Sequence, residues 1–378
     1  MVNYGFLSTY PPTQCGLATF CAALARQLSN PARGDRCGIV QVVDGVYRTM
    51  RHEPGGESVP GPPLDVGRAV EALNRCDVLI LQHEYGIYGG LDGEDVLDVI
   101  EHVDIPVIAV LHTVAARPTP HQHLVLQGVI DASDAIVVLS QSAVATLESG
   151  YLIGERRVSV IPHGAPVIGR ARPGSAGGGR GPTILTWGLL GPGKGIEWAL
   201  SALGYLRDLR PTPRYLVAGQ THPKVLAQHG EAYRDGLRRR AQAEGVADLV
   251  EFDPVYREVG PLMDMVRRAD VVLLPYDSSE QVTSGVLIEA VAAGRPVVAT
   301  GFPHARELLG GGAGLVVAHR DPRAMAEAIR RVLTEPGLAE SMRARCAELA
   351  PGLAWAAVAD GYRALAKTLL AAPAPVAP

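Results

Sequence analysis

Two glutamates lie around a turn that could bind an anion. Glu280 precedes the Thr283-Ser284-Gly285 turn, and Glu289 follows it inside an apolar segment. Thr, Ser and Gly favour a helix N-terminus, where free amides and the helix dipole attract phosphate. Glu289 would then project on the same face as that N-terminus, and a carboxylate there accepts two hydrogen bonds from a vicinal diol such as ribose. The alternative is that Glu289 only complements the helix dipole.

A glycine-rich turn predicts a second anion site. A strand at residues 183–187 runs into GLLGPGKG, and a helix begins near Gly195. Gly191 and Gly193 let the backbone approach a ligand closely, and Lys194 stands at the helix entrance, so the turn could hold a diphosphate. It is not a Walker loop, since no Ser or Thr follows the lysine. The alternative is a plain strand–helix turn with a solvated lysine.

Polar and aromatic side chains also end three strands in the first half of the chain. His83, Glu84 and Tyr85 end one strand, and His112 and His163 end two others. A single such histidine is more often structural, but three on one predicted sheet edge favour a site. HExxH and similarly spaced ligand sets are absent, so we expect no protein-bound metal. GxSxG is absent too, which disfavours an α/β-hydrolase.

Short apolar, β-branched runs must position these residues. Runs that are apolar at consecutive positions read as strands buried on both faces. Helical patterns separate several of them, which predicts α/β architecture with two doubly wound parallel sheets, whose ligands bind beyond the carboxyl ends of the strands. The runs cover residues 2–8, 38–44, 78–84, 106–113, 135–140, 158–164, 183–188, 215–220, 249–254, 271–276, 296–300 and 314–318.

The domain boundaries follow from these runs and from one Gly-rich stretch. Residues 1–168 form an N-terminal Rossmann-like domain, 169–182 a flexible linker, and 183–350 a C-terminal Rossmann-like domain. Residues 351–370 have a helical apolar pattern and are expected to pack back toward the N-terminal domain. Residues 371–378 form a disordered tail. Two facing domains would enclose a cleft.

Composition excludes several classes of protein. The chain has 378 residues, 47% of them hydrophobic, which suffices for two cores. A formal charge of −4 gives no basic footprint for nucleic acid. Five scattered cysteines without CxxC spacing favour reduced thiols in the cytoplasm. No segment is apolar for the ~20 residues of a membrane span, which leaves peripheral membrane contact open. The oligomeric state is not indicated.

The combined motifs resemble the GT-B glycosyltransferases, specifically the retaining family 4 (glycosyl transferases group 1). LLGPGKGIEWAL, VIPHG and SGVLIEAVAAGRPVVAT carry the resemblance, which spans nearly the whole chain; HEYGIYGG and LHT look like a bacterial subgroup. The resemblance implies a GT-B fold and a hexosyltransferase of carbohydrate biosynthesis. Its sugar donor would be a GDP- or UDP-linked hexose. Its acceptor would be a hydroxyl of a sugar, a lipid-linked molecule or a small molecule, with no metal or other cofactor.

The resemblance also implies roles for individual residues. Lys194 would stabilise the departing diphosphate, Glu289 would bind the ribose, and His112 would polarise or position the transferred sugar. The acceptor would lie mostly against the N-terminal domain. The other candidates are Gly16, Gly191, Gly193, Gln281, Ser284, Gly285 and Val286 on the sugar-donor side, and His83, Glu84 and Tyr85 on the acceptor side.

The sequence departs from the family at a basic position. An arginine often follows the first glycine of the phosphate loop, where this chain has Leu189. Lys194 would then act alone, or with another base such as Arg295 or Arg306.

A second departure concerns the sugar-facing acid. The residue eight positions before Glu289 is Gln281, and Glu280 is displaced by one. Two alternatives to an active transferase therefore stay open. One is a catalytically weak or inactive nucleotide-sugar-binding regulatory module. The other is a sugar-nucleotide epimerase or a phosphorylase on the same fold.

Overall fold

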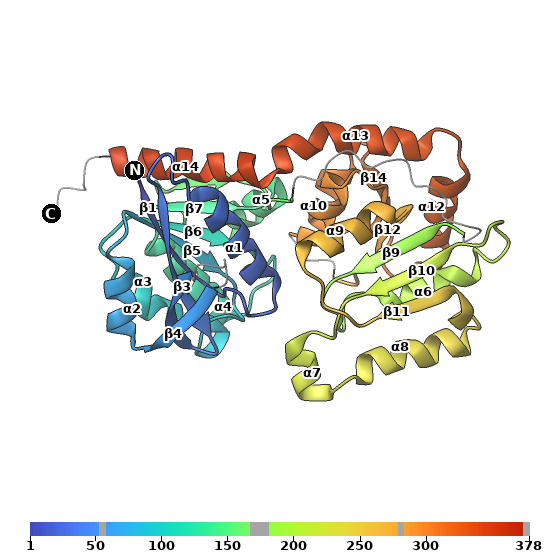
Figure 1. Cartoon of the computed structure of the whole chain (residues 1–378), viewed down its shortest axis with the longest axis horizontal. Helices are drawn as coiled ribbons and strands as arrows, with labels where there is room; N and C mark the ends of the chain where they lie inside the picture. The colour runs from blue at the N-terminus through green and yellow to red at the C-terminus, as the bar shows by residue number, and fades with distance from the viewer. Residues whose placement is uncertain (53–57, 167–180, 279–282, 373–378) are drawn as a thin grey trace. The chain divides into compact units, whose positions relative to one another are not determined.

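The computed structural model describes residues 1–52, 58–166, 181–278 and 283–372 (Figure 1). The chain divides into two compact units, each described here by itself. Unit 1 comprises Met1–Gly164 and Trp355–Pro378, and unit 2 comprises Ala165–Ala354. Most of the predicted linker at 169–182 and of the predicted tail at 371–378 lies outside the described residues.

Unit 1 contains one eight-stranded sheet with six parallel strands. The strand order is β4-β3-β2-β1-β5-β6-β7-β8. The parallel strands confirm the six runs predicted in this half. They are β1 (Asn3–Ser8), β2 (Arg36–Val43), β5 (Val78–His83), β6 (Val107–Leu111), β7 (Ala135–Val138) and β8 (Arg157–Val160).

Two antiparallel strands at one side of the unit 1 sheet were not predicted. They are β3 (Val46–His52) and β4 (Ser58–Leu64). Neither has a continuous apolar run: β3 reads VYRTMRH, and β4 reads SVPGPPL with three prolines. β4 is the edge strand, and prolines are tolerated there because one side of its backbone needs no ladder partner. β3 lies between β4 and β2.

The C-terminal helix completes the core of unit 1. α14 (Trp355–Ala371) packs against α1 (Gly16–Leu28), and Phe20, Leu24, Trp355 and Tyr362 share one buried cluster (Figure 1). The remaining helices of this unit are α2 (Val66–Leu73), η1 (Leu91–Gly93), α3 (Asp95–Ile100), α4 (Pro120–Asp131) and α5 (Gln141–Gly150).

Unit 2 contains a six-stranded, all-parallel sheet in the order β11-β10-β9-β12-β13-β14. All six strands predicted in this half are confirmed. They are β9 (Thr183–Trp187), β10 (Arg214–Ala218), β11 (Val250–Asp253), β12 (Val271–Leu274), β13 (Val297–Thr300) and β14 (Gly314–Val317). The strand order changes direction between β9 and β12, and ligands of doubly wound sheets bind beyond the strands at such a point.

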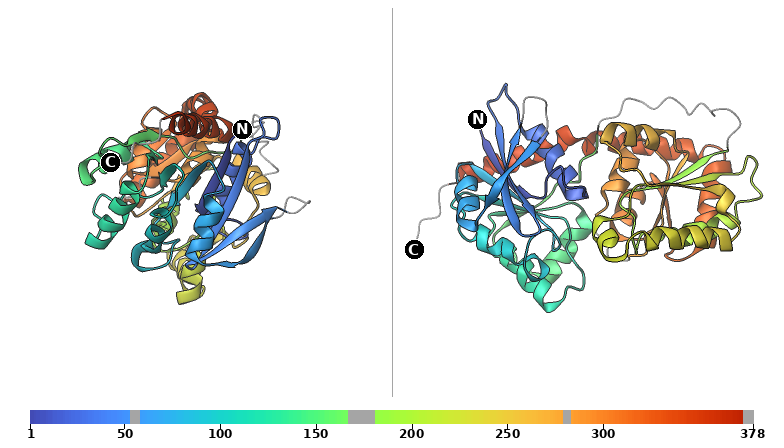
Figure 2. Two further views of the ribbon diagram at one scale, coloured as in Figure 1. Left: turned by 90° about the vertical axis from the view of Figure 1, so that its left-hand side faces the viewer. Right: turned by 60° about the horizontal axis from the view of Figure 1, so that its bottom comes forward.

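Helices cover both faces of this sheet, as one view shows clearly (Figure 2). One buried cluster involves α9 (Val259–Arg268), α10 (Gly285–Ala292), α11 (Pro303–Leu309) and α13 (Leu338–Leu353). The other involves α6 (Ile196–Gly204), α8 (Ala232–Ala243) and α12 (Pro322–Thr334). The shorter α7 (Pro223–His229) and η2 (Ala247–Leu249) complete the unit. Within the described residues, no helix is both long and apolar enough to span a membrane.

Candidate functional site

The turn between β9 and α6 is fixed to the neighbouring strand end. Gly195, the N-cap of α6, has φ 65°, and a Cβ there would lie 1.8 Å from the Pro275 carbonyl oxygen. The Asp277 amide donates to the Gly193 carbonyl at 2.9 Å. The Lys194 ammonium lies 4.8 Å from the centroid of the Tyr276 ring, within cation–π range. Lys194 is therefore held at the carboxyl edge where the strand order reverses.

The N-terminus of α10 presents two backbone amides. The Ser284 hydroxyl accepts from the Leu287 amide at 3.2 Å, and the Ser284 amide donates to Nδ1 of His304 at 3.1 Å. Burial lowers the pKa of His304 to about 4, which keeps the ring neutral and able to accept. Within the described part of the chain, the amides of Gly285 and Val286 have no acceptor. The structure thus leaves Gly285 and Val286 open to a ligand, while Ser284 shapes the helix start.

Glu289 has one carboxylate oxygen held and one open. The indole Nε1 of Trp187, at the end of β9, donates to Oε2 at 3.3 Å. Oε1 has no hydrogen-bond partner among the described residues. Burial raises the pKa of Glu289 to about 7, against the lowering effect of the Trp187 hydrogen bond. A ligand hydroxyl could therefore donate to Oε1.

The predicted sugar contact of Gln281, and its neighbour Glu280, lie outside the described residues. The two arginines considered as substitutes for a base at Leu189 are described. Arg295 donates to the carbonyls of residues 267 and 269, which precede β12 at the amino edge of the sheet. It is thus at the wrong edge to assist Lys194. Arg306 follows β13 at the carboxyl edge, where its Nε donates to the Gly301 carbonyl at 2.8 Å.

In unit 1, His112 is a neutral imidazole fixed by a buried amide. Its Nε2 lies 2.6 Å from Oε1 of Gln82, a residue with 0% exposure. Burial, assisted by His163 and His83, lowers the pKa of His112 to about 3. An amide oxygen can only accept a hydrogen bond. With the Gln82 amide in this orientation, Nε2 of His112 therefore carries the proton, and Nδ1 keeps a lone pair that can accept. Phe20 packs edge-on against both His112 and His163, at centroid distances of 4.8 and 5.0 Å.

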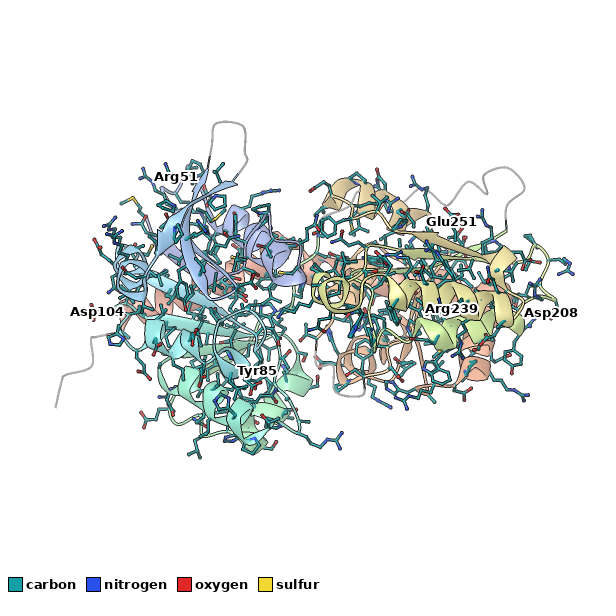
Figure 3. The ribbon with its side chains drawn as sticks, turned by 90° about the horizontal axis from the view of Figure 1, so that it is seen from below. Arg51, Tyr85, Asp104, Asp208, Arg239 and Glu251 are labelled. Carbon is teal, nitrogen blue, oxygen red and sulfur yellow. The ribbon has the colours of Figure 1, made fainter. Side chains whose placement is uncertain are left out.

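The three acceptor-side candidates differ in accessibility. His83 is 1% exposed, and burial lowers its pKa to about 4, so it packs within the unit. Glu84 is partly exposed and accepts from the Thr113 hydroxyl at 2.6 Å. Tyr85, also partly exposed, lies edge-on to His83 beyond the carboxyl end of β5, well away from Asp104 before β6 (Figure 3). Glu84 is thus the better placed to meet a ligand, whereas Tyr85 is partly exposed but has a buried hydroxyl.

Gly16 is an open position at the start of α1. It is exposed, and a Cβ there would have no atom within 4 Å. Cys15 caps the helix, since its sulfur accepts from the Ala18 amide at 3.4 Å. No described residue of unit 1 therefore crowds the Cβ position of Gly16.

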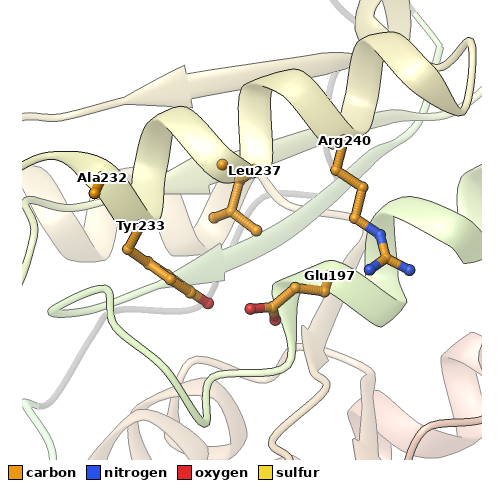
Figure 4. A pocket seen from close by; sticks show the side chains of 6 residues that line it. Glu197, Ala232, Tyr233, Leu237 and Arg240 are labelled. Atoms are coloured by element: carbon orange, nitrogen blue, oxygen red, sulfur yellow. The ribbon is translucent and has the colours of Figure 1, made fainter.

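A hollow of about 450 Å³ lies between α6 and α8, away from these residues. The Tyr233 hydroxyl and the Glu197 carboxylate point toward one another there (Figure 4). None of the candidate site residues lines it. The lining residues are Glu197, Ala232, Tyr233, Gly236, Leu237 and Arg240. Across the described ranges, no group of three or more His, Cys, Asp or Glu side chains could hold a metal ion.

The chain is similar in sequence to known glycosyltransferases. Residues 181–335 match the family model described as Glycosyl transferases group 1. A D-inositol 3-phosphate glycosyltransferase of Kineococcus radiotolerans is 28% identical over 68% of this chain and 65% of its own. The protein of the same name from Frankia alni is 29% identical over 72% of this chain and 70% of its own. A glycogen synthase of Mycobacterium tuberculosis is 29% identical over 71% of this chain and 64% of its own. The chain spans about two thirds of the length of these relatives.

Solved structures establish the fold. A sucrose-phosphate synthase from Thermosynechococcus elongatus has a TM-score of 0.73 at 18% identity, covering 99% of this chain and 100% of that one. The Anabaena protein HepE, solved with UDP and glucose, has a TM-score of 0.71 at 15% identity, covering 97% and 100%. The chain therefore has the GT-B fold of these glycosyltransferases. More particularly, residues 181–335 match the glycosyl transferases group 1 model, in agreement with the resemblance read from the motifs.

Three residues that shape the site were not predicted: Trp187, Gln82 and His304. Each acts through a hydrogen bond to a candidate residue, namely Glu289, His112 or Ser284. Trp187 and Gln82 end strands and look like ordinary core residues in the sequence. The His304 position carries no motif of its own, so no sequence signal could have singled it out.

Proposed function

We propose that the chain is an active retaining hexosyltransferase. It would move a hexose from a nucleotide-diphosphate sugar, UDP- or GDP-linked, to a hydroxyl of a sugar, lipid-linked or small-molecule acceptor. The observation that supports this best is the start of α10. The Gly285 and Val286 amides are open there, and four residues after Gly285 the Glu289 carboxylate has one open oxygen. A diphosphate needs N–H donors and a ribose diol needs acceptor oxygens, and this helix start offers both.

Lys194 and the α10 amides would carry the chemical step. When the bond between the anomeric carbon and the phosphate oxygen breaks, charge develops on the diphosphate, and fixed positive groups stabilise it. The new bond forms to the acceptor oxygen on the same face, and the acceptor proton passes to the departing phosphate oxygen. No protein base is then needed. The neutral His112, whose Nδ1 is left as an acceptor, suits a role in positioning a sugar hydroxyl.

The comparisons suggest which substrates to try first. HepE was solved with UDP and glucose, which favours a uridine-linked donor for this chain. Two curated relatives are named for D-inositol 3-phosphate, which makes it a first acceptor to test. We propose that unit 1 contributes acceptor contacts through Glu84 and Tyr85, and that Gln281 contributes to sugar recognition.

A thermal-shift panel tests the sugar-donor half of the proposal. GDP, UDP, ADP and dTDP sugars are compared, because a ligand of the native state raises the melting temperature by mass action. We expect one nucleotide to stand out and Glu289→Ala to abolish its shift. dUDP should shift less than UDP, because it lacks one ribose hydroxyl. A panel without any shift would overturn the proposal.

A product assay tests the reaction itself. The best sugar donor is incubated with D-inositol 3-phosphate or simple sugars, and NMR reads the anomeric configuration of the product. We expect retention. An inverted product would refute the retaining mechanism, and an epimerised nucleotide sugar would favour the epimerase. Binding without transfer or hydrolysis would favour a regulatory module, for which the missing arginine at Leu189 is the observation.

A further inference from the structure

We infer that Trp187 is a positioning residue for the nucleotide: its indole N–H holds one oxygen of Glu289 so that the other oxygen faces the ribose. This inference rests on the proposed function, because it presumes that Glu289 meets a ribose. Trp187 would not touch the reacting atoms. It would act only through the carboxylate of Glu289.

The geometry makes Trp187 a rigid anchor. It is the last residue of β9, a central strand, and it is 5% exposed. Its ring belongs to the same buried cluster as Tyr276 and Ile288, so the indole cannot easily turn away. An indole has one donor and no acceptor, and here that donor meets Oε2 of Glu289 at 3.3 Å.

The uncharged nature of this anchor matters for the ligand. A glutamate carboxylate otherwise rotates broadly about its last bond. An arginine or lysine in place of Trp187 would also restrain it, but would compete with the ribose for the negative charge. The tryptophan fixes one oxygen and leaves the charge unpaired, so the ribose hydroxyls become the best partners for the carboxylate.

The charged groups near α10 do not take over this function. Lys194 sits over the Tyr276 ring, and His304 on α11 is kept neutral by burial. The pKa of Glu289 reflects only burial, which raises it to about 7, and the Trp187 hydrogen bond, which lowers it. Ribose hydroxyls donate to the ionised form, so binding of the nucleotide should strengthen as the pH rises through about 7.

The test measures binding of UDP by calorimetry from about pH 5.5 to 8.5, a range that spans the pKa of Glu289. UDP is replaced by the best nucleotide if the thermal-shift panel selects another. Trp187→Phe removes the N–H and keeps an aromatic ring, and Trp198→Phe on α6 is the matched control. We expect W187F to weaken binding about tenfold at neutral pH, the usual effect of one hydrogen bond to a charged group. The midpoint of the pH dependence of UDP binding should move to higher pH in W187F, because the lost hydrogen bond lowers the pKa of Glu289. W198F should bind UDP as the unaltered protein does.

Two probes separate positioning from general damage. Inorganic pyrophosphate lacks a ribose, so W187F should bind it as the unaltered protein does. Glu289→Gln, with or without W187F, should leave only the pH dependence that the terminal phosphate of UDP brings, with its second pKa of about 6. If W187F does not fold, benzothienylalanine at position 187 keeps both fused rings and removes only the N–H.

The outcomes are distinct. The positioning role would be overturned if W187F binds UDP with the same affinity and the same pH midpoint as the unaltered protein. It would also be overturned if W187F loses equal affinity for UDP and for pyrophosphate. If the unaltered protein binds the nucleotide and Glu289→Gln weakens it while W187F does not, this inference fails and the proposed function stands. If no nucleotide binds at any pH, both fail.

Discussion

Replacing Glu289 by glutamine should stabilise the ligand-free protein, and the gain should grow with pH. Burial raises the pKa of Glu289 from 4.5 to about 7. A carboxyl whose pKa is higher in the folded chain favours folding in its protonated form. That stabilisation is complete below about pH 4.5 and is lost as the pH rises through about 7. Glutamine is neutral throughout, so it avoids the loss.

The size of the effect follows from the two pKa values. Their difference is 7 − 4.5 = 2.5, and each pKa unit corresponds to about 1.4 kcal/mol, so the full effect is roughly 3 kcal/mol. At each pH the gain in unfolding free energy of E289Q depends on how far Glu289 has ionised in the folded and unfolded chains. It is about 1 kcal/mol at pH 5, about 2 kcal/mol at pH 6 and about 3 kcal/mol at pH 7 to 8. A change of this size is a large part of the stability of an ordinary domain.

Urea unfolding followed by tryptophan fluorescence measures this gain in unit 2. A Trp355→Phe background leaves only Trp187 and Trp198, both in unit 2. The exposed Glu327 on α12 provides the matched control, and Glu327→Gln should give a small difference that does not follow the same pH curve. A difference between E289Q and the parent that stays flat from about pH 5 to 8 would refute the reasoning.

Three other substitutions test single hydrogen bonds or charges. Lys194→Ala should lower kcat roughly 10- to 100-fold, because it removes the positive charge that would stabilise the departing diphosphate. Lys194→Arg should retain part of the activity. Normal turnover of Lys194→Ala would contradict this role of Lys194. Gln82→Leu should raise KM for the sugar donor by freeing His112 to rotate. Gln82→Glu should instead raise the pKa of His112 and move the pH–rate profile. Unchanged kinetics in both variants would count against Gln82 positioning His112. His304→Phe should cost roughly 1–3 kcal/mol of stability by leaving the Ser284 amide without an acceptor, and His304→Asn, which keeps an acceptor, should cost less; equal urea midpoints would show that the bond is unimportant.

The predicted strands were those whose signal is strongest in a sequence. A parallel strand buried on both faces needs consecutive apolar residues, and all twelve such runs are strands in the structure. β3 and β4 were missed because these antiparallel strands at one side of the sheet are only partly buried: Val46 and Val59 are 39% and 44% exposed. Such strands look like loops when only the apolar pattern is considered.

The candidate ligand residues could be placed from the sequence where a backbone turn fixes them. Gly193, Lys194, Gly285 and Glu289 follow strand ends or helix starts, whose geometry is local. The residues that hold these candidates in place are distant from them in the sequence. Trp187 lies 102 positions from its partner, Gln82 lies 30 and His304 lies 20. Such contacts arise only when separate strands and helices pack, so no spacing rule anticipates them. The contact of Gln281 stays a prediction.

The properties of Glu289 are those expected of a residue retained for binding rather than for stability. Its segment is apolar, and a leucine or glutamine there would not have to be ionised in a buried place at neutral pH. Its one described hydrogen-bond partner is an uncharged indole that satisfies only one of its oxygens. The unfavourable free energy of the ligand-free protein then becomes part of the driving force for a ligand that brings two hydroxyl donors to the carboxylate. A phosphate or a base alone brings no hydroxyl pair, so under the proposed function this arrangement would select for the ribose between them.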